Sequence, residues 1–178
     1  ITDAELRNID QFVMHGGSLG VFGGELMVDI EGGAELAAAP TGSNVNALLE
    51  GWGITFRDGI VADAQCGRVP MRTPMGIPLP VPYPPAPIVT FDEGESEHPV
   101  LFRLTEAPLF FATPIATTEA FRAFGVGEPD VLGAAVLMQS TASNSWLLEG
   151  DSISLRIRQP GEWGATMRTA ESGPFALG

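Results

Sequence analysis

The chain has 178 residues, of which 44% are apolar and 17% charged, and its net charge is −13 at neutral pH. This length and composition predict one globular domain with a hydrophobic core rather than a disordered chain. The acidic balance argues against nucleic acid and against an anionic membrane surface as partners, because both require a positive footprint.

The composition also excludes several kinds of functional site. All nine basic residues are arginines, so a Schiff-base lysine and a P-loop lysine are absent. Cys66 is the single cysteine, which excludes an intramolecular disulfide and a CxxC metal or redox site. No apolar run reaches the roughly 18–20 residues that span a membrane. The polar start is not typical of a signal peptide, and we expect the chain to be part of a longer protein.

The first 24 residues predict a helix followed by a strand. Thr2 and Glu5 have the spacing of a capping box, and the helix that follows has one apolar face that must be covered. Gly16 and Gly17 end the helix, and residues 18–22 predict a short buried strand. A helix that leads into a buried strand is half of a parallel α/β repeat.

The next 40 residues predict short elements separated by glycines. Residues 25–44 indicate an irregular excursion, and residues 44–50 predict a second short helix. Strands are predicted at 54–56 and 60–62, with a turn at 57–59 between them.

Residues 67–87 contain eight prolines. Since each proline lacks a donor N–H, we expect this segment to run as a surface loop, partly in the polyproline II conformation, and not as a central strand. Residues 92–97 are acidic. Residues 67–99 are therefore predicted to be a Pro-rich and acidic loop insertion.

The last part of the chain predicts strands and loops. Residues 132–139 predict a strongly buried strand, and the alternation in 152–158 predicts a half-buried one. The remaining expectations are a turn at 98–101, a β-prone segment at 109–112, a helical turn at 118–124, a polar loop at 140–145 and a loop over 161–173. Together these elements predict a single α/β domain over residues 1–178, with an open, mixed, mainly parallel sheet, helices packed on it, and long irregular loops.

Four stretches carry a resemblance to a known family. In chain order they are LRNIDQFVMHGGSLGVFGG, NALLEGWGITFRDGIVAD, HPVLFRLTEAPLFFATPI and LMQSTASNSW. Together they resemble the extracytoplasmic region of the gliding-motility-type (GldG-like) auxiliary components of ABC transporters. The sequence departs from that family at Gly23-Gly24-Glu25, where an acid-proline turn is usual, and in the unusual richness of its proline segment.

The resemblance implies a membrane-anchored protein on the extracytoplasmic (periplasmic) face of the cell membrane, beside an ABC permease and ATPase. It implies a fold that is flavodoxin-like, in part like class I glutamine amidotransferases. It brings no catalytic, cofactor or metal residues with it. The expected function is therefore a non-catalytic domain of a transport auxiliary subunit that binds proteins or substrate, in which the proline-rich and acidic loops are the expected contact surfaces.

Two other functions stay open. One is an amidotransferase-like cysteine hydrolase, with Cys66 as nucleophile and His15 or His98 as base. The sequence around Cys66 lacks the Gly-x-Cys-x-Gly elbow, and a small buried or half-buried thiol is the simpler interpretation. The other is a carbohydrate- or peptide-binding module that uses a tryptophan platform, although isolated tryptophans usually anchor a core. The three are Trp52, Trp146 and Trp163.

Three further clusters of residues are more simply explained by a structural role than by a functional one. Carboxylates near His98 could bind calcium, but without the spacing of a calcium loop they indicate a solvated acidic segment; they are Asp92, Glu93, Glu95 and Glu97. The polar residues after residue 139 predict a capping and turn segment rather than a nucleophile or ligand loop; they are Ser140, Ser143, Asn144 and Ser145. Gly16 and Gly17 precede a predicted strand, whereas the glycines of a nucleotide-binding fingerprint follow one.

Overall fold

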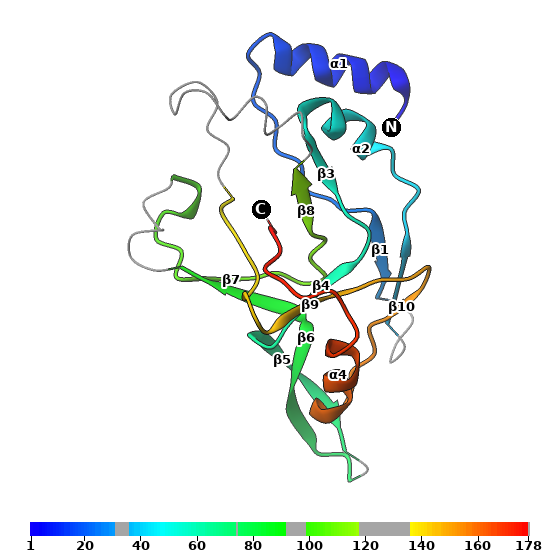
Figure 1. The fold of residues 1–178 in the computed structure, drawn as a ribbon, viewed down its shortest axis with the longest axis vertical. Coiled ribbons are helices and arrows are strands. Elements are labelled where there is room, and N and C mark those ends of the chain that lie inside the picture. The colour runs from blue at the N-terminus through cyan, green and yellow to red at the C-terminus, as the bar shows by residue number, and fades with distance from the viewer. Residues whose placement is uncertain (31–35, 74, 92–98, 118–135, 178) are drawn as a thin grey trace.

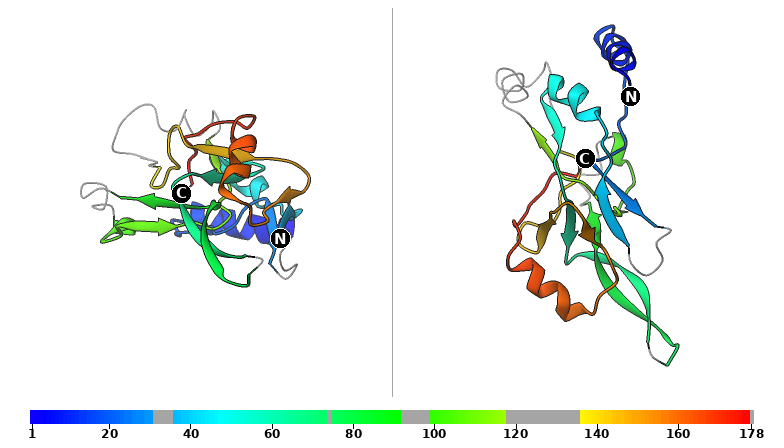
Figure 2. Two further views of the ribbon diagram at one scale, coloured as in Figure 1. Left: turned by 90° about the horizontal axis from the view of Figure 1, so that it is seen from below. Right: turned by 90° about the vertical axis from the view of Figure 1, so that its right-hand side faces the viewer.

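The computed structural model describes residues 1–30, 36–73, 75–91, 99–117 and 136–177. These residues form an elongated, β-rich fold with short helices (Figure 1). Helix α1 (Asp3–Met14) lies at one end of the molecule, and a long hairpin of strands β5 (Cys66–Arg72) and β6 (Pro78–Thr90) lies at the other. Figure 2 shows the same arrangement from two further sides.

The described strands form small antiparallel sheets. One sheet joins β1 (Leu26–Asp29), β2 (Ala37–Pro40) and β10 (Ile153–Ser154). Two pairs are β3 (Ile54–Phe56) with β8 (Ile115–Thr117), and β4 (Ile60–Asp63) with β9 (Ser145–Leu148). The last sheet joins β5, β6 and β7 (Glu106–Pro108). The remaining elements are α2 (Val45–Leu49), η1 (Glu50–Trp52), η3 (Pro99–Leu101) and α4 (Pro160–Met167).

The predicted mainly parallel sheet is wrong, and with it the flavodoxin-like and amidotransferase-like fold. Every strand pairing within the described ranges is antiparallel. A parallel pair needs a crossover of about a dozen residues or more, usually a helix. Here β3 is followed by a three-residue turn and β5 returns directly as β6. The buried strand predicted at 18–22 is also absent, since this segment has no regular structure and Phe22 is 99% exposed.

Several local predictions are confirmed. Glu5 N donates to Thr2 Oγ1 (3.3 Å) and Thr2 N donates to Glu5 Oε2 (2.8 Å), which completes the capping box of α1. The helix ends before Gly16, whose φ of +89° favours glycine. Helix α2 and strands β3 and β4 also form where they were predicted. In contrast, no residue of α1 is fully buried: Leu6, Ile9 and Val13 of its apolar face are half-buried, and Phe12 is 56% exposed.

The prediction that the proline segment is a surface loop is wrong, because β6 contains six prolines and lies between β5 and β7. Prolines 78, 80 and 82 alternate with Leu79 and Val81, which face Met71 and Val69 of β5. Successive strand residues direct their N–H groups to opposite sides, so these prolines remove donors from one side only. Proline carbonyls still accept: Leu109 N donates to Pro87 O, and Phe111 N donates to Pro85 O, both at 2.8 Å.

Other predictions in the second half are corrected or lie outside the described residues. The β-prone segment 109–112 forms no strand. Residues 136–139, the described part of the strand predicted over 132–139, also form none, although Gln139 makes an isolated antiparallel bridge with Ala176. The predicted strand 152–158 is reduced to β10. The predicted loop 161–173 begins with α4, because Trp163 packs edge-on against Tyr83 (6.4 Å between ring centres) and so offsets the low helix propensity of two glycines. The helical turn at 118–124 and the acidic segment 92–98 fall outside the described ranges.

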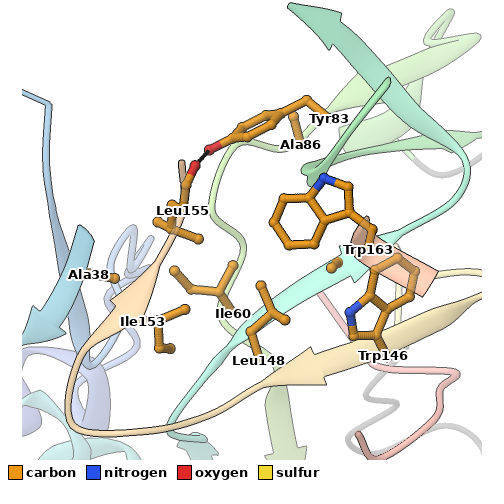
Figure 3. Packing of buried hydrophobic residues seen from close by; sticks show 10 residues of the cluster. Ala38, Ile60, Tyr83, Ala86, Trp146, Leu148, Ile153, Leu155 and Trp163 are labelled. Atoms are coloured by element: carbon orange, nitrogen blue, oxygen red, sulfur yellow. Dashed lines mark hydrogen bonds between the residues drawn. The ribbon is translucent and has the colours of Figure 1, made fainter. Parts of the chain in front are cut away.

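The main core lies where β4, β6, β9, β10 and α4 meet (Figure 3). All four residues of β4 are buried. The Tyr83 hydroxyl donates to Leu155 O at 2.5 Å, which ties β6 to the segment after β10. Each fully buried large apolar side chain here stabilises the fold by roughly 1.5–3 kcal/mol. The cluster consists of Ala38, Ile60, Ala62, Tyr83, Ala86, Trp146, Leu148, Ile153, Leu155 and Trp163.

Candidate functional site: an apolar groove

A groove of about 580 Å³ is the candidate binding site. Its walls come from two segments without regular structure, residues 21–24 and 109–113, and from parts of β1, β3, β7 and β8. Among the described residues that line it, Thr113 has the one polar side chain and none is charged. They are Val21, Phe22, Gly23, Gly24, Leu26, Phe56, Pro108, Leu109, Phe110, Phe111, Ala112, Thr113, Ile115, Met138 and Leu177. Such a surface suits an apolar ligand or an apolar protein segment.

Gly24 lets the two walls approach each other. A Cβ atom at this position would lie 2.5 Å from Thr113 Oγ1 and 3.1 Å from Thr113 Cβ. Any larger side chain at residue 24 would therefore push the 21–24 segment away from the 109–113 segment. Gly24 of the Gly23–Gly24 pair is therefore a point of close contact in the groove, whereas a Cβ atom at Gly23 would meet nothing within 4 Å.

Phe110 and Phe111 point to different environments because the backbone is strained at Phe111. Its φ is +59°, a left-handed conformation that is rare for a bulky residue. The Phe111 ring packs edge-on against Tyr83, with 6.3 Å between ring centres, while Phe110 stays 61% exposed at the groove. Strain of this kind costs on the order of 1–3 kcal/mol and is concentrated at binding sites.

A second apolar hollow, of about 340 Å³, lies on the other side of the 21–24 segment. It is lined by residues of α1 and α2, among them Ile9 and Leu48, and it shares Val21–Gly24 with the groove. Phe22 borders both hollows and is almost completely exposed. Residues 19–24 therefore form an apolar ridge between two apolar hollows.

The structure gives Cys66 no support as a nucleophile. Burial raises the pKa of the Cys66 thiol above its usual value, with a smaller contribution from the Asp63 charge, so the thiol stays protonated at neutral pH. His15 caps α1, at the opposite end of the molecule from β5, and its Nδ1 lies 2.6 Å from Gln11 O. His98 lies outside the described residues. The interpretation of Cys66 as a half-buried thiol is confirmed.

The predicted polar loop forms a turn whose side chains make hydrogen bonds to other parts of the fold. Ser140 Oγ accepts from Phe175 N (2.8 Å) and lies 2.9 Å from Ser145 Oγ, which donates to Thr141 O. The buried carboxylate of Asp63 anchors this turn. It accepts from Gln65 N (2.8 Å), Thr141 N (2.7 Å) and Thr141 Oγ1 (2.9 Å). The interpretation as a turn segment is therefore confirmed, and this role of Asp63 was missed.

The tryptophans do not form a platform. Trp146 and Trp163 are buried in the main core, and Trp52 is half-buried with its Nε1 donating to Asp10 Oδ1 (3.3 Å). The pocket-lining residues named above include none of the three. Across the described ranges, no three His, Cys, Asp or Glu side chains gather where a metal ion could be held, which leaves residues 92–98 untested.

The groove itself was missed because its two walls are far apart in sequence. No local pattern marked Phe110 and Phe111, because these residues lie in a turn with a left-handed backbone at Phe111 and not in an extended segment. Phe22 gave a misleading signal, because its apolar sequence neighbours predicted burial.

Among the described helices, none combines the length and the apolar character required to cross a bilayer.

The fold and the groove define a β-rich domain with an open apolar groove and an interior in which the Asp63 carboxylate and the Ser140 and Ser145 hydroxyls are hydrogen-bonded. A family model described as an ABC-type uncharacterized transport system matches residues 1–177. The chain therefore belongs to this family of auxiliary components of ABC transport systems. Searches of curated proteins and of solved structures return no match.

Proposed function

We propose that this chain is the non-catalytic, extracytoplasmic part of a GldG-like auxiliary subunit, and that it binds an apolar segment of the permease in its groove. The family supports association with a transport system. The resemblance of the four sequence stretches supports a place on the outer face of the cell membrane, beside the permease and the ATPase. The groove supports a binding role.

The observation that carries the proposal is the apolar groove with Phe22 and Phe110 on its walls. A groove without charged side chains does not select an ionic substrate, but it can bury leucine- or phenylalanine-rich protein segments. Exposed aromatic side chains at the rim of such a groove are typical anchors of protein interfaces. A protein segment fits the groove better than a small polar solute for this reason.

The test is co-purification from membranes with a tagged form of the complete protein. We expect the permease and ATPase to co-purify with the wild type, and Phe22→Ser and Phe110→Ser each to weaken recovery about tenfold or more. Phe102→Ser is the matched control, because Phe102 is 65% exposed, close to the 61% of Phe110, but does not line the groove.

Three outcomes can be told apart. Loss of both partners in the groove variants alone supports the proposal. Unchanged recovery in all variants would show that the groove is not the contact surface. Absence of an ABC permease from the wild-type sample would overturn the auxiliary-subunit role itself.

A further inference from the structure

The β5–β6 hairpin ends in a well-defined apolar tip. Gly76 N donates to Thr73 O (2.9 Å), Thr73 N donates to Ile77 O (3.1 Å), and Ile77 N donates to Thr73 Oγ1 (3.2 Å). These bonds hold the turn, and no other element of the described chain covers it (Figure 2). Met75 is 84% exposed and Ile77 62%, and Leu79 beside them is also exposed. We call Met75, Ile77 and Leu79 the hairpin tip.

The hairpin differs in charge from the rest of the molecule. Arg68 and Arg72 are the only charged residues between positions 64 and 91, so this segment has a positive charge in a chain of net −13. Both arginines are exposed and, four residues apart in β5, lie on the same face of the strand. Arg72 faces Pro78 next to the tip, and Arg68 faces Pro82, two pleat repeats further from the tip.

The length of the hairpin separates the tip from the acidic body. Tyr83 is buried in the core, and five residues of β6 lead from it to Pro78, which corresponds to about 17 Å of strand. The Debye length at physiological ionic strength is about 8 Å. A negative surface at the tip therefore meets Arg72 first, and Arg68 lies about 13 Å further along β5, between the tip and the carboxylates of the body.

We propose that the hairpin tip inserts into the interface of a lipid bilayer that contains anionic lipids. Met75, Ile77 and Leu79 would bury their side chains at the boundary of headgroups and acyl chains, and Arg72 and Arg68 would pair with lipid phosphates. Apolar burial combined with arginine–phosphate attraction is how interfacial segments bind membranes. The charge of the arm selects an anionic surface, although the net charge of the whole chain argues against one. This proposal does not depend on the groove.

The test is flotation of the chain with vesicles of phosphatidylcholine alone and of phosphatidylcholine mixed with phosphatidylglycerol. We expect binding to the mixed vesicles that falls as salt rises. The double variant Arg68→Gln/Arg72→Gln should bind about 25-fold more weakly, from the attraction of an anionic surface for each basic residue. Met75→Ser/Ile77→Ser should bind at least about tenfold more weakly. These residues are exposed, so the variants should keep the wild-type circular dichroism spectrum.

Matched controls exist elsewhere on the chain. Met27→Ser/Ile30→Ser removes the same two residue types, which are 65% and 72% exposed, near the β1–β2 sheet. Arg7→Gln/Arg156→Gln removes two exposed arginines outside the hairpin. Both controls should bind like the wild type.

The proposal is overturned if the wild type floats with neither vesicle or equally with both, or if the tip variants bind like their controls. Light scattering covers the alternative that the tip joins two copies: a dimer lost in Met75→Ser/Ile77→Ser, with unchanged flotation, would also overturn it. Co-purification of the permease from detergent should be insensitive to the hairpin variants. The failure of one proposal is thereby distinguishable from the failure of the other.

Discussion

The Asp63 carboxylate connects the end of β4 to the turn before β9 through hydrogen bonds. Because it accepts three hydrogen bonds in a buried position, its removal leaves Gln65 N and Thr141 N without an acceptor. We expect Asp63→Ala to lower the free energy of unfolding by about 3 kcal/mol, measured by urea denaturation. Thr141→Val removes one of the three bonds and should cost about 1 kcal/mol. Equal losses in both variants would contradict the assignment of Asp63 as the anchor.

Tyr83 makes the stability of the fold sensitive to alkaline pH. Burial raises the pKa of Tyr83 to about 12 from 10.0. The unfolded chain therefore loses the phenol proton first, so the stability is fully present below pH 10 and is lost as the pH rises through about 12. Two pKa units correspond to about 2.7 kcal/mol.

The variant Tyr83→Phe tests this dependence. It should cost about 1 kcal/mol at pH 7, because Leu155 O loses its donor, and should remove most of the decline between pH 10 and 12. The Tyr83 protein and the Tyr83→Phe variant should both carry Cys66→Ala, because the raised pKa of the Cys66 thiol also lowers stability as the pH rises. Parallel stability curves in this pH range, from urea titrations, would show that Tyr83 does not titrate as a buried group.

At the scale of single elements, α1 depends on its own cap more than on tertiary contacts. No residue of α1 is buried, whereas the capping box at Thr2 and Glu5 is complete. We expect Thr2→Ala to weaken the helix by about 1 kcal/mol, which is about fivefold faster amide exchange in α1. The melting temperature and the exchange of α2 should stay unchanged. A lower melting temperature would show that α1 is coupled to the core.

The predictability of each element follows from where its determinants lie. The capping box of α1 and the glycine turn between β3 and β4 depend on neighbouring residues, and both could be predicted from the sequence. Residues 18–22 have the composition of a strand, but a strand forms only with a partner, and no described segment pairs with this one. The prediction for the proline segment was wrong for another reason. Prolines do lack donors, but prolines at alternate positions remove donors from only one side of a strand, so the other side can still pair.

The groove could not be predicted from local sequence patterns, because residues 21–24 and 109–113 come together only in the folded chain. The left-handed backbone of Phe111, which lines the groove beside Phe110, is a second feature that arises only in the folded chain. Neither fact leaves a periodic signal. The burial of Trp146 and Trp163 in the core, in contrast, agreed with the interpretation that the sequence already favoured.

For the whole molecule, the balance of 22 acidic and nine basic residues makes repulsion the main electrostatic term. Even the ion pair between Arg57 and Glu171, at 2.7 Å, is largely exposed and contributes little. We expect an increase in sodium chloride from low to high concentration to stabilise the fold by about 1 kcal/mol, or about 2–4 °C in melting temperature. A protein held by attractive surface pairs would respond in the opposite direction. Calorimetry at several salt concentrations measures the sign.

The alternating prolines of β6 bear on a property of the molecule in concentrated solution. Prolines 78, 80 and 82 face residues of β5 with which they cannot exchange two hydrogen bonds, so their missing N–H groups lie along the outer edge of the hairpin. An apolar strand with an exposed edge is otherwise a template for edge-to-edge pairing and aggregation. This edge offers no donors at those positions, so the hairpin can present apolar side chains to a partner while a strand that approaches the β6 edge cannot form a regular hydrogen-bonded ladder with it.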